Sequence, residues 1–229
     1  MSLLVTRGLG KIYDARGIET VALADIDLSI EAGEFSALAG PSGSGKTTLL
    51  NMLGALDQPS SGEVWLEGRR LADLNSAQLA ELRLRKLGFV FQAYNLIPVL
   101  SARENVEFVM ELQGVPREDR RKRAEEVLED VELGGFFDKR PLEMSGGQQQ
   151  RVAVARAIAS RPRIVLADEP TANLDSKTAG NLLDLMERLN RERGVTFLFS
   201  THDSLVMDKA RRIVHLRDGR ISNDERKGG

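Results

Sequence analysis

The sequence contains no cysteine among its 229 residues, so it forms no disulfide, no thiolate metal site and no thiol nucleophile. Aromatic residues are scarce at 5%, and no apolar run approaches the roughly 20 residues that span a bilayer. The start, MSLLVTRGLGK, lacks the charged segment and long apolar stretch of a secretion signal. We therefore expect a protein that stays inside the cell and is soluble by itself.

Neither sign of charge dominates, because 32 Lys and Arg stand against 34 Asp and Glu. The net charge of -2 creates no global basic field for nucleic acid or an acidic membrane, so any site for a polyanion must be local. Hydrophobic residues make up 41% of the chain, which is ordinary globular usage and argues against disorder or a fibrous repeat.

The hydrophobic pattern alternates between strands and helices. Short apolar runs without alternation, typical of parallel strands covered on both faces, occupy residues 35–40, 89–92, 163–168 and 196–201. Apolar residues at helical spacing occupy residues 46–54, 101–113, 117–131, 145–160 and 176–193. Residues 23–30 alternate instead and predict an antiparallel edge strand with one wet face. The order predicts a doubly wound α/β core. We interpret residues 95–140 as a helical insertion, and we expect the polar tail SNDERKGG to fray.

A glycine-rich segment follows the first apolar run. GPSGSGKTT matches the pattern G-x-x-x-x-G-K-[ST] from Gly40 to Thr47, between a strand and a helix. In such a loop the backbone N–H groups and the helix N-terminus bind phosphate oxygens, Lys46 reaches the terminal phosphates and the Thr47 hydroxyl ligates Mg²⁺. A chance glycine-rich turn would need neither flanking element. The predicted phosphate-binding residues are Gly40, Pro41, Ser42, Gly43, Ser44, Gly45, Lys46, Thr47 and Thr48.

Two carboxylates end a buried strand at RIVLADEP. Adjacent strand residues point in opposite directions, so Asp168 can face a metal ion while Glu169 faces the γ-phosphate and an attacking water. Ligands of parallel sheets bind beyond the carboxyl ends of the strands, where this pair lies. The alternative is a solvated acidic strand end. The phosphate loop upstream favours magnesium binding by Asp168 and a water-polarising role for Glu169.

A second helix start has the sequence MSGGQQQR. Ser145 and Gln148 form the pattern of a capping box, but a capping box does not require Gly146 and Gly147. Consecutive glycines lose much backbone entropy, which indicates that the backbone must approach something closely. The hydroxyl, the N–H groups and the helix dipole together predict a second anion site.

MSGGQQQR, placed between the phosphate loop and RIVLADEP, resembles the signature motif of ABC-transporter ATPase subunits, and the similarity covers essentially the whole chain. The resemblance implies one ABC ATPase domain over residues 1–229. Its P-loop NTPase core, with a mostly parallel sheet and a small antiparallel β part, would occupy residues 1–94 and 141–229, with an α-helical subdomain at 95–140. It also implies a head-to-tail homodimer with ATP at the interface. Ser145, Gly146, Gly147 and Gln148 would then contact the partner's nucleotide. Met144 replaces the family's usual Leu, which conserves volume.

Further motifs follow in the order of the family. By resemblance, Tyr13 stacks on adenine, Gln92 touches Mg²⁺ and links the nucleotide to the insertion, Asp175 helps to join the subunits, and His202 contacts the γ-phosphate. The alternatives are that Tyr13 is a half-buried structural residue, that Gln92 is a polar residue at a strand end, and that the segment containing Asp175 is a simple turn. His215, in the expected strand RIVHL, is interpreted as structural.

The strings FVFQAYNLIPVLSARENV and LGALDQPSSGEVWLEG resemble the lipoprotein-release, macrolide-export and cell-division ATPases. This implies an ATPase on the cytoplasmic side of the inner membrane that powers a separate integral-membrane permease. Residues 93–108 would receive a cytoplasmic helix of the permease, unless they form a small satellite core. An amino-acid-type importer remains the alternative within transport.

The basic run PREDRRKR is interpreted as a solvated helix face, since acids are interspersed in it. Relatives that act on nucleic acid carry two ATPase domains, a zinc module or a long coiled-coil arm. Between Gln92 and Ser145 there is no room for such an arm, so no nucleic-acid partner is expected. A regulatory module without turnover is disfavoured because both Glu169 and His202 are present.

Overall fold

A six-stranded sheet forms the centre of the protein in the computed structural model, which describes residues 2–15 and 17–227. The strand order is β10-β9-β3-β8-β7-β6. The strands are β3 (Phe35–Ala39), β6 (Leu87–Val90), β7 (Ile164–Asp168), β8 (Phe197–Thr201), β9 (Arg212–Arg217) and β10 (Arg220–Arg226). Four of the pairings are parallel, and β10 pairs antiparallel with β9. The predicted α/β fold with a mostly parallel sheet is confirmed.

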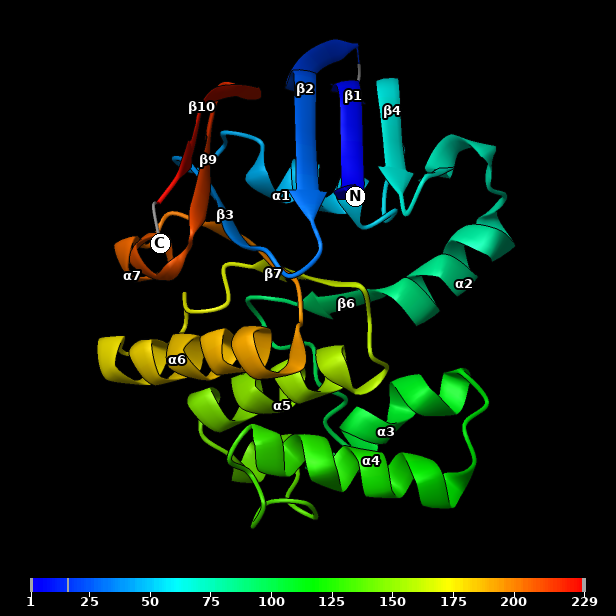
Figure 1. Ribbon diagram of the computed structural model, residues 1–229, viewed down its shortest axis with the longest axis vertical. Coiled ribbons are helices and arrows are strands. Elements are labelled where there is room, and N and C mark those ends of the chain that lie inside the picture. Colours follow the sequence, from blue (N-terminus) through cyan, green and yellow to red (C-terminus); the bar gives the residue numbers. More distant parts are fainter. Residues whose placement is uncertain (1, 16, 228–229) are drawn as a thin grey trace.

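A smaller antiparallel sheet has the order β2-β1-β4-β5. Its strands are β1 (Ser2–Ala15), β2 (Ile18–Glu31), β4 (Ser61–Leu66) and β5 (Arg69–Arg70). The strand predicted at residues 23–30 lies in β2, at the edge of this sheet, as expected. Figure 1 shows this sheet at the top of the molecule, with the cluster of helices at the bottom.

The helices are α1 (Lys46–Leu53), α2 (Ser76–Lys86), α3 (Ala102–Leu112), α4 (Arg117–Asp130), α5 (Gly146–Ala159), α6 (Ser176–Arg193) and α7 (Ser204–Lys209), with short 3-10 turns at Leu71–Asp73 and Pro141–Glu143. The five helices that the sequence predicts are present. Within the predicted insertion, α3 and α4 form two sides of the lower helical cluster (Figure 1). Among the described residues, no helix has the length and apolar character required to cross a membrane.

Two hydrophobic cores lie on opposite faces of the central sheet. Val165 and Ala167 of β7 pack with α3 to α6, whereas Ile164 and Leu166 pack with α1 and the antiparallel sheet. This division follows from the alternation of side chains along a strand, and it explains why the parallel strands are apolar throughout. The cores leave the carboxyl ends of β3 and β7 free to carry polar residues.

The polar tail does not fray over its described part, so that expectation was wrong there; its last two residues, 228–229, lie outside the described residues. Residues up to Arg226 form β10, which pairs with β9 along its length. Arg212, which is buried, donates two hydrogen bonds to the Asp224 carboxylate, at 2.9 and 2.7 Å, and also contacts Glu34. An ion pair between distant residues thus fixes a strand whose side chains are too polar to signal one.

We expect Asp224→Asn to lower the melting temperature at pH 7 by a few degrees, which corresponds to about 1 kcal/mol for a partly exposed charged pair. Hydrogen bonds from Arg212 hold the pKa of the Asp224 carboxyl below its ordinary value. The stabilisation is therefore complete above the unfolded pKa of about 4 and is lost as the pH falls through the folded pKa. Thermal scans from pH 7 to pH 2 should show the two proteins converging. Asp218→Asn, in an exposed turn, is the control and should change little.

Candidate functional site

The glycine-rich loop lies between the end of β3 and the start of α1. A Cβ atom at Gly40 would lie 2.3 Å from the Leu216 carbonyl oxygen, and at Gly45 it would lie 2.6 Å from the Ala22 carbonyl oxygen. Gly45 also has a φ of 100°, which disfavours any side chain. These two glycines let the loop pack closely against the backbone of β9 and β2, while Pro41, Ser42 and Gly43 stay exposed. The backbone therefore stays accessible to a ligand.

Lys46, in the first turn of α1, folds back over this loop. Its ammonium donates to the carbonyl oxygens of Gly40, at 2.7 Å, and Pro41, at 3.0 Å. The same nitrogen lies 4.0 Å from Glu169 Oε1. The side chain is buried, and these contacts hold its ammonium over the loop.

Thr47 and Asp168 meet although 121 residues separate them in the sequence. The Thr47 hydroxyl lies 3.1 Å from both carboxylate oxygens of Asp168, at the end of β7. A hydroxyl and a carboxylate are ligands that Mg²⁺ accepts, together with substrate phosphates and water. Among the described residues, no three acidic, His or Cys side chains form a closed metal cage. The donor set thus fits a magnesium ion that arrives with a nucleotide.

Glu169 meets the histidine of the neighbouring strand end. His202 Nδ1 lies 2.8 Å from Glu169 Oε1. Glu169 has a φ of 45°, in the left-handed region, and its N–H donates to the Ser200 carbonyl of β8 at 2.9 Å. Strained backbone of this kind collects at functional sites. The structure therefore gathers Lys46, Glu169 and His202 around one point beyond the strand ends.

The serine-glycine corner of α5 is a complete capping box. Ser145 Oγ accepts from the Gln148 N–H at 3.3 Å, and Gln148 Oε1 accepts from the Ser145 N–H at 2.9 Å. The glycines are also explained within the chain, because a Cβ would lie 2.8 Å from Tyr94 Oη at Gly146 and 2.4 Å from Thr178 Cγ2 at Gly147. The inference that consecutive glycines indicate close backbone approach is confirmed, but the neighbours seen are protein atoms. These contacts do not test a role toward a nucleotide.

Tyr13 lies on β1 with 40% of its surface exposed. Its hydroxyl donates to Asp57 Oδ2 at 2.9 Å, and the Lys11 ammonium, itself bonded to Asp57, lies 4.8 Å from the ring centre. Partial burial and Asp57 raise the pKa of the Tyr13 hydroxyl, while Lys11 and Thr48 lower it by less. Lys11 and Asp57 thus fix the orientation of the ring.

The contacts of Gln92, Asp175 and His215 are structural ones within the chain. Gln92 lies just beyond β6, and its carbonyl accepts from Asn173 Nδ2 at 2.9 Å. Asp175 caps α6, accepting from the N–H groups of Lys177 and Thr178, and hydrogen bonds from Thr178 and these N–H groups lower the pKa of its carboxyl. His215 lies on β9 and contacts Glu225 at 3.2 Å, as expected of a structural residue.

Sequence reasoning missed the residues that orient the predicted ones. Lys11 and Asp57 fix Tyr13, Asn173 holds the Gln92 carbonyl, and Arg156 of α5 donates to the backbone of residues 94 and 95. None lies in a motif that predicts such contacts by its spacing. Only the fold brings each to its partner.

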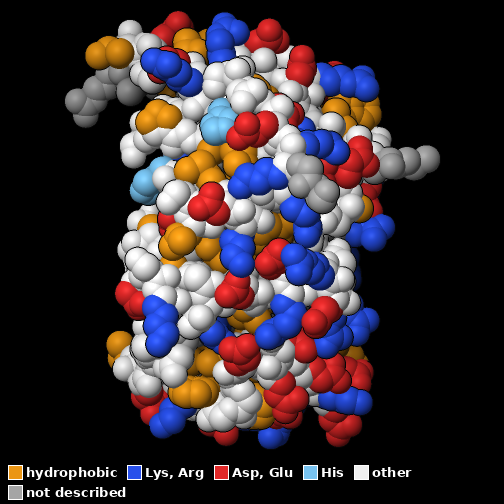
Figure 2. All heavy atoms as spheres, turned by 60° about the vertical axis from the view of Figure 1, so that its left-hand side comes forward, with side chains coloured by type: hydrophobic (Ala, Val, Ile, Leu, Met, Phe, Trp, Pro, Cys, Tyr) orange, Lys and Arg blue, Asp and Glu red, His pale blue; other side chains and the backbone are white. Residues whose placement is uncertain are grey.

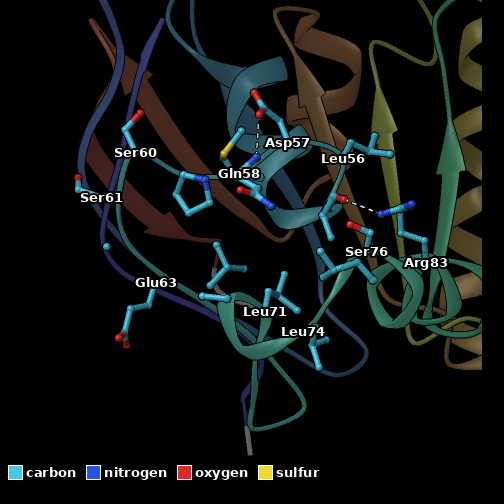
Figure 3. A pocket seen from close by; sticks show the side chains of 17 residues that line it. Leu56, Asp57, Gln58, Ser60, Ser61, Glu63, Leu71, Leu74, Ser76 and Arg83 are labelled. Carbon is cyan, nitrogen blue, oxygen red and sulfur yellow. Dashed lines mark hydrogen bonds between the residues drawn. The ribbon is translucent and has the colours of Figure 1, made fainter.

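A pocket of about 440 Å³ lies outside the phosphate loop, and its lining residues include Asp57. Figure 3 shows Leu56, Asp57 and Gln58 on one side of it and Leu71, Leu74 and Ser76 on the other. Arg83 of α2 closes one end by donating to the Ala55 carbonyl at 2.8 Å. Asp57 connects this pocket to Tyr13.

The sequence model of the ABC transporter family matches residues 23–172. The lipoprotein-releasing system ATP-binding protein LolD of Anaeromyxobacter dehalogenans is 47% identical over 218 residues, covering 95% of this chain and 91% of LolD. The macrolide export ATP-binding/permease protein MacB 1/2 of Paracoccus denitrificans is 46% identical over 226 residues, covering 99% of this chain but 34% of MacB.

Among solved structures, the dimeric post-hydrolysis state of the cassette MJ0796 of Methanocaldococcus jannaschii, bound to ADP and phosphate, superposes with a TM-score of 0.90. It is 43% identical, and the match covers 99% of both chains. The phosphate loop, the carboxylate pair and the histidine therefore lie in a cassette of known type. The chain belongs to the ABC transporter family, as one of its ATP-binding and ATP-hydrolysing subunits.

Proposed function

We propose that this chain powers a separate permease of the lipoprotein-release or macrolide-export type from the cytoplasmic face of the membrane, to which it binds peripherally. The convergence of Lys46, Glu169 and His202 beyond the strand ends carries the ATPase part of this proposal. The similarity to LolD, of which the chain covers 91%, supports the type of transporter. The domain is a single unit over residues 1–229, with residues 95–140 as its helical insertion.

Residues 93–108 are the proposed docking surface for the permease. Val99 is 72% exposed and Phe108 of α3 is 39% exposed, whereas Leu96 packs against the core. The segment therefore combines a buried anchor with apolar side chains that a partner can cover. On the face that Figure 2 shows, which is not the face of residues 93–108, acidic and basic side chains intermingle, so the described residues present no broad basic surface for nucleic acid there.

Hydrolysis of ATP passes through a loose transition state, so the chain acts by positioning and by electrostatic stabilisation. The loop N–H groups within residues 42–45 hold the phosphates, and Lys46 neutralises charge on the terminal one. Mg²⁺, when bound by Thr47, Asp168 and Gln92, supplies Lewis-acid neutralisation of phosphate oxygens. Glu169 orients the attacking water and accepts its proton, and His202 contacts the γ-phosphate.

Two copies of the chain are proposed to pack head to tail. Ser145, Gly146, Gly147 and Gln148 of one copy then close over ATP held by the phosphate loop of the other, and Asp175 joins the two. The capping box leaves other N–H groups of the α5 first turn available for a phosphate. The dimeric state of the MJ0796 cassette supports the pairing of two copies.

Purification of the chain from native membranes, followed by identification of the permease that accompanies it, tests the transporter type. We expect an integral-membrane protein of the lipoprotein-release or macrolide-export kind. An amino-acid importer subunit in its place would contradict the proposed type. Measurement of ATP hydrolysis with and without DNA or RNA adds a second test, because marked stimulation by either would favour a role on nucleic acid.

We expect Tyr13→Ala to weaken ATP binding by about 10-fold, because stacking of a base on an aromatic ring contributes about 1–3 kcal/mol. Tyr13→Phe is the matched control, since it keeps the ring and removes only the hydrogen bond to Asp57. It should bind ATP within about 3-fold of the wild type. Equilibrium titration with ATP measures both, and equal losses in the two variants would show that the hydroxyl, rather than the ring, matters.

A further inference from the structure

Two consecutive residues after Gln92 have left-handed backbone conformations without being glycine. Tyr94 has a φ of 60° and Asn95 a φ of 51°. Residues with side chains rarely adopt this region, and they remain there only where surrounding contacts hold them. The hydrogen bonds from the Tyr94 N–H to Phe91 and from the Asn95 N–H to Ala93 are local to the turn. A contact from outside the turn is therefore expected.

That contact is the guanidinium of Arg156, in the last turns of α5. It donates through Nη2 to the Tyr94 carbonyl, at 2.8 Å, and through Nη1 to the Asn95 carbonyl. Within the described part of the chain, no carboxylate forms an ion pair with Arg156, and burial lowers the pKa of its guanidinium. A partly buried cation that donates hydrogen bonds to two consecutive carbonyls fits a role in fixing that backbone.

Further contacts join the same turn to the beginning of α5. The Tyr94 hydroxyl lies 2.8 Å from the position that a Cβ would take at Gly146, the first residue of the helix. The Tyr94–Asn95 turn is therefore connected to α5 at two points, through the Tyr94 side chain at Gly146 and through the Arg156 side chain near the end of the helix. In Figure 1, α5 lies between α6 and the pair α3 and α4, where it packs against the rest of the helical cluster.

We propose that Arg156 is a positioning residue for ATP hydrolysis, which holds the Tyr94–Asn95 turn so that Gln92 and the serine-glycine corner of α5 move as one unit. The proposal rests on the role of Gln92 given above. Arg156 itself touches no substrate. When the corner closes over the partner's nucleotide, the two hydrogen bonds of Arg156 carry that movement to Gln92, two residues before the turn.

Hydrogen exchange of the full chain, read on peptides covering residues 91–100, tests the contact without reference to activity. In Arg156→Gln we expect exchange there to accelerate by about 10-fold, because hydrogen bonds from a charged donor are lost. Arg151→Gln is the matched control, since Arg151 also lies on α5 and donates to a backbone carbonyl, that of Val131, at 3.0 Å. It should leave these peptides unchanged. Unchanged exchange in Arg156→Gln would overturn the proposal.

Kinetics of the full chain test the positioning role. Arg156→Gln should lower kcat about 10-fold and leave the KM for ATP near the wild-type value, since the phosphate loop is intact. Arg156→Lys keeps the charge but cannot donate to both carbonyls in the same geometry, so its kcat should lie between those of Arg156→Gln and the wild type. The double variant Arg156→Gln/Gln92→Ala should lose no more kcat than Gln92→Ala alone.

The two readouts separate the ways in which the proposal can fail. Additive losses of kcat, or a loss confined to KM, would mean that Arg156 does not act through Gln92 and would overturn the positioning role. If Gln92→Ala alone leaves kcat unchanged, the proposed role of Gln92 fails, and the positioning role fails with it. The exchange measurement would still decide whether Arg156 holds the turn.

Discussion

Glu169→Gln should hydrolyse ATP about 10³-fold more slowly than the wild type while binding ATP at least as tightly. The amide keeps the size of the side chain and its contact with His202, but it accepts no proton from water, and general-base catalysis contributes about 10²–10⁴-fold. Glu169 Oε1 also lies 4.0 Å from Lys46 Nζ and 2.8 Å from His202 Nδ1. These are the cationic and polar groups proposed to receive the γ-phosphate, so removal of the carboxylate charge should favour phosphate binding.

Single-turnover hydrolysis and equilibrium ATP binding measure the two parts of this prediction separately. Asp184→Asn is a suitable control, because Asp184 is an exposed carboxylate of α6 that pairs with Lys209 at 2.6 Å, away from the phosphate loop. It should have normal turnover. Near wild-type turnover in Glu169→Gln would remove Glu169 from the mechanism.

The parts of the fold that were predicted are those with a local signal. Residues 164–168 and 197–201 form strands because they are apolar on both faces, and the two cores on opposite sides of the sheet require that pattern. The helix α3 begins with a capping box, from Ser101 to Glu104, that the sequence itself displays. Such features depend on a few neighbouring residues, so the sequence alone is sufficient to find them.

The parts that were missed have little signal within their own segments. β10 forms because Arg212 holds Asp224 and because β9 offers a free edge, and neither is visible in the polar tail itself. α2 has one buried side chain, that of Leu82, so its helical pattern is weak. The candidate site follows the same division, since Lys46, Asp168 and Glu169 lie in contiguous motifs whereas Arg156 and Asp57 act on residues far along the chain.

Gly147→Ala should lower ATP hydrolysis about 10²-fold, and two separate causes can produce this loss. A Cβ at Gly147 would lie 2.4 Å from Thr178 Cγ2, so either the Thr178 side chain or the first turn of α6 must shift. In the proposed dimer Gly147 also lies against the partner's nucleotide, where the loss of one N–H donor would cost about 10²–10³-fold in rate. The single variant does not distinguish the two causes.

The double variant Gly147→Ala/Thr178→Ser distinguishes them. Serine lacks the methyl group that the new Cβ would meet, but it keeps the hydroxyl that donates to Asp175 Oδ2 at 2.6 Å and thus preserves the cap of α6. We expect the melting temperature to return toward that of the wild type while hydrolysis stays low, because in the proposed dimer a Cβ at position 147 also limits how closely the first turn of α5 approaches the partner's ATP. Gly180→Ala on α6, where a Cβ meets no atom within 4 Å, controls for the substitution itself. Recovery of hydrolysis in the double variant would mean that the glycine only makes room for Thr178, and Gly147 would then leave the proposed nucleotide site.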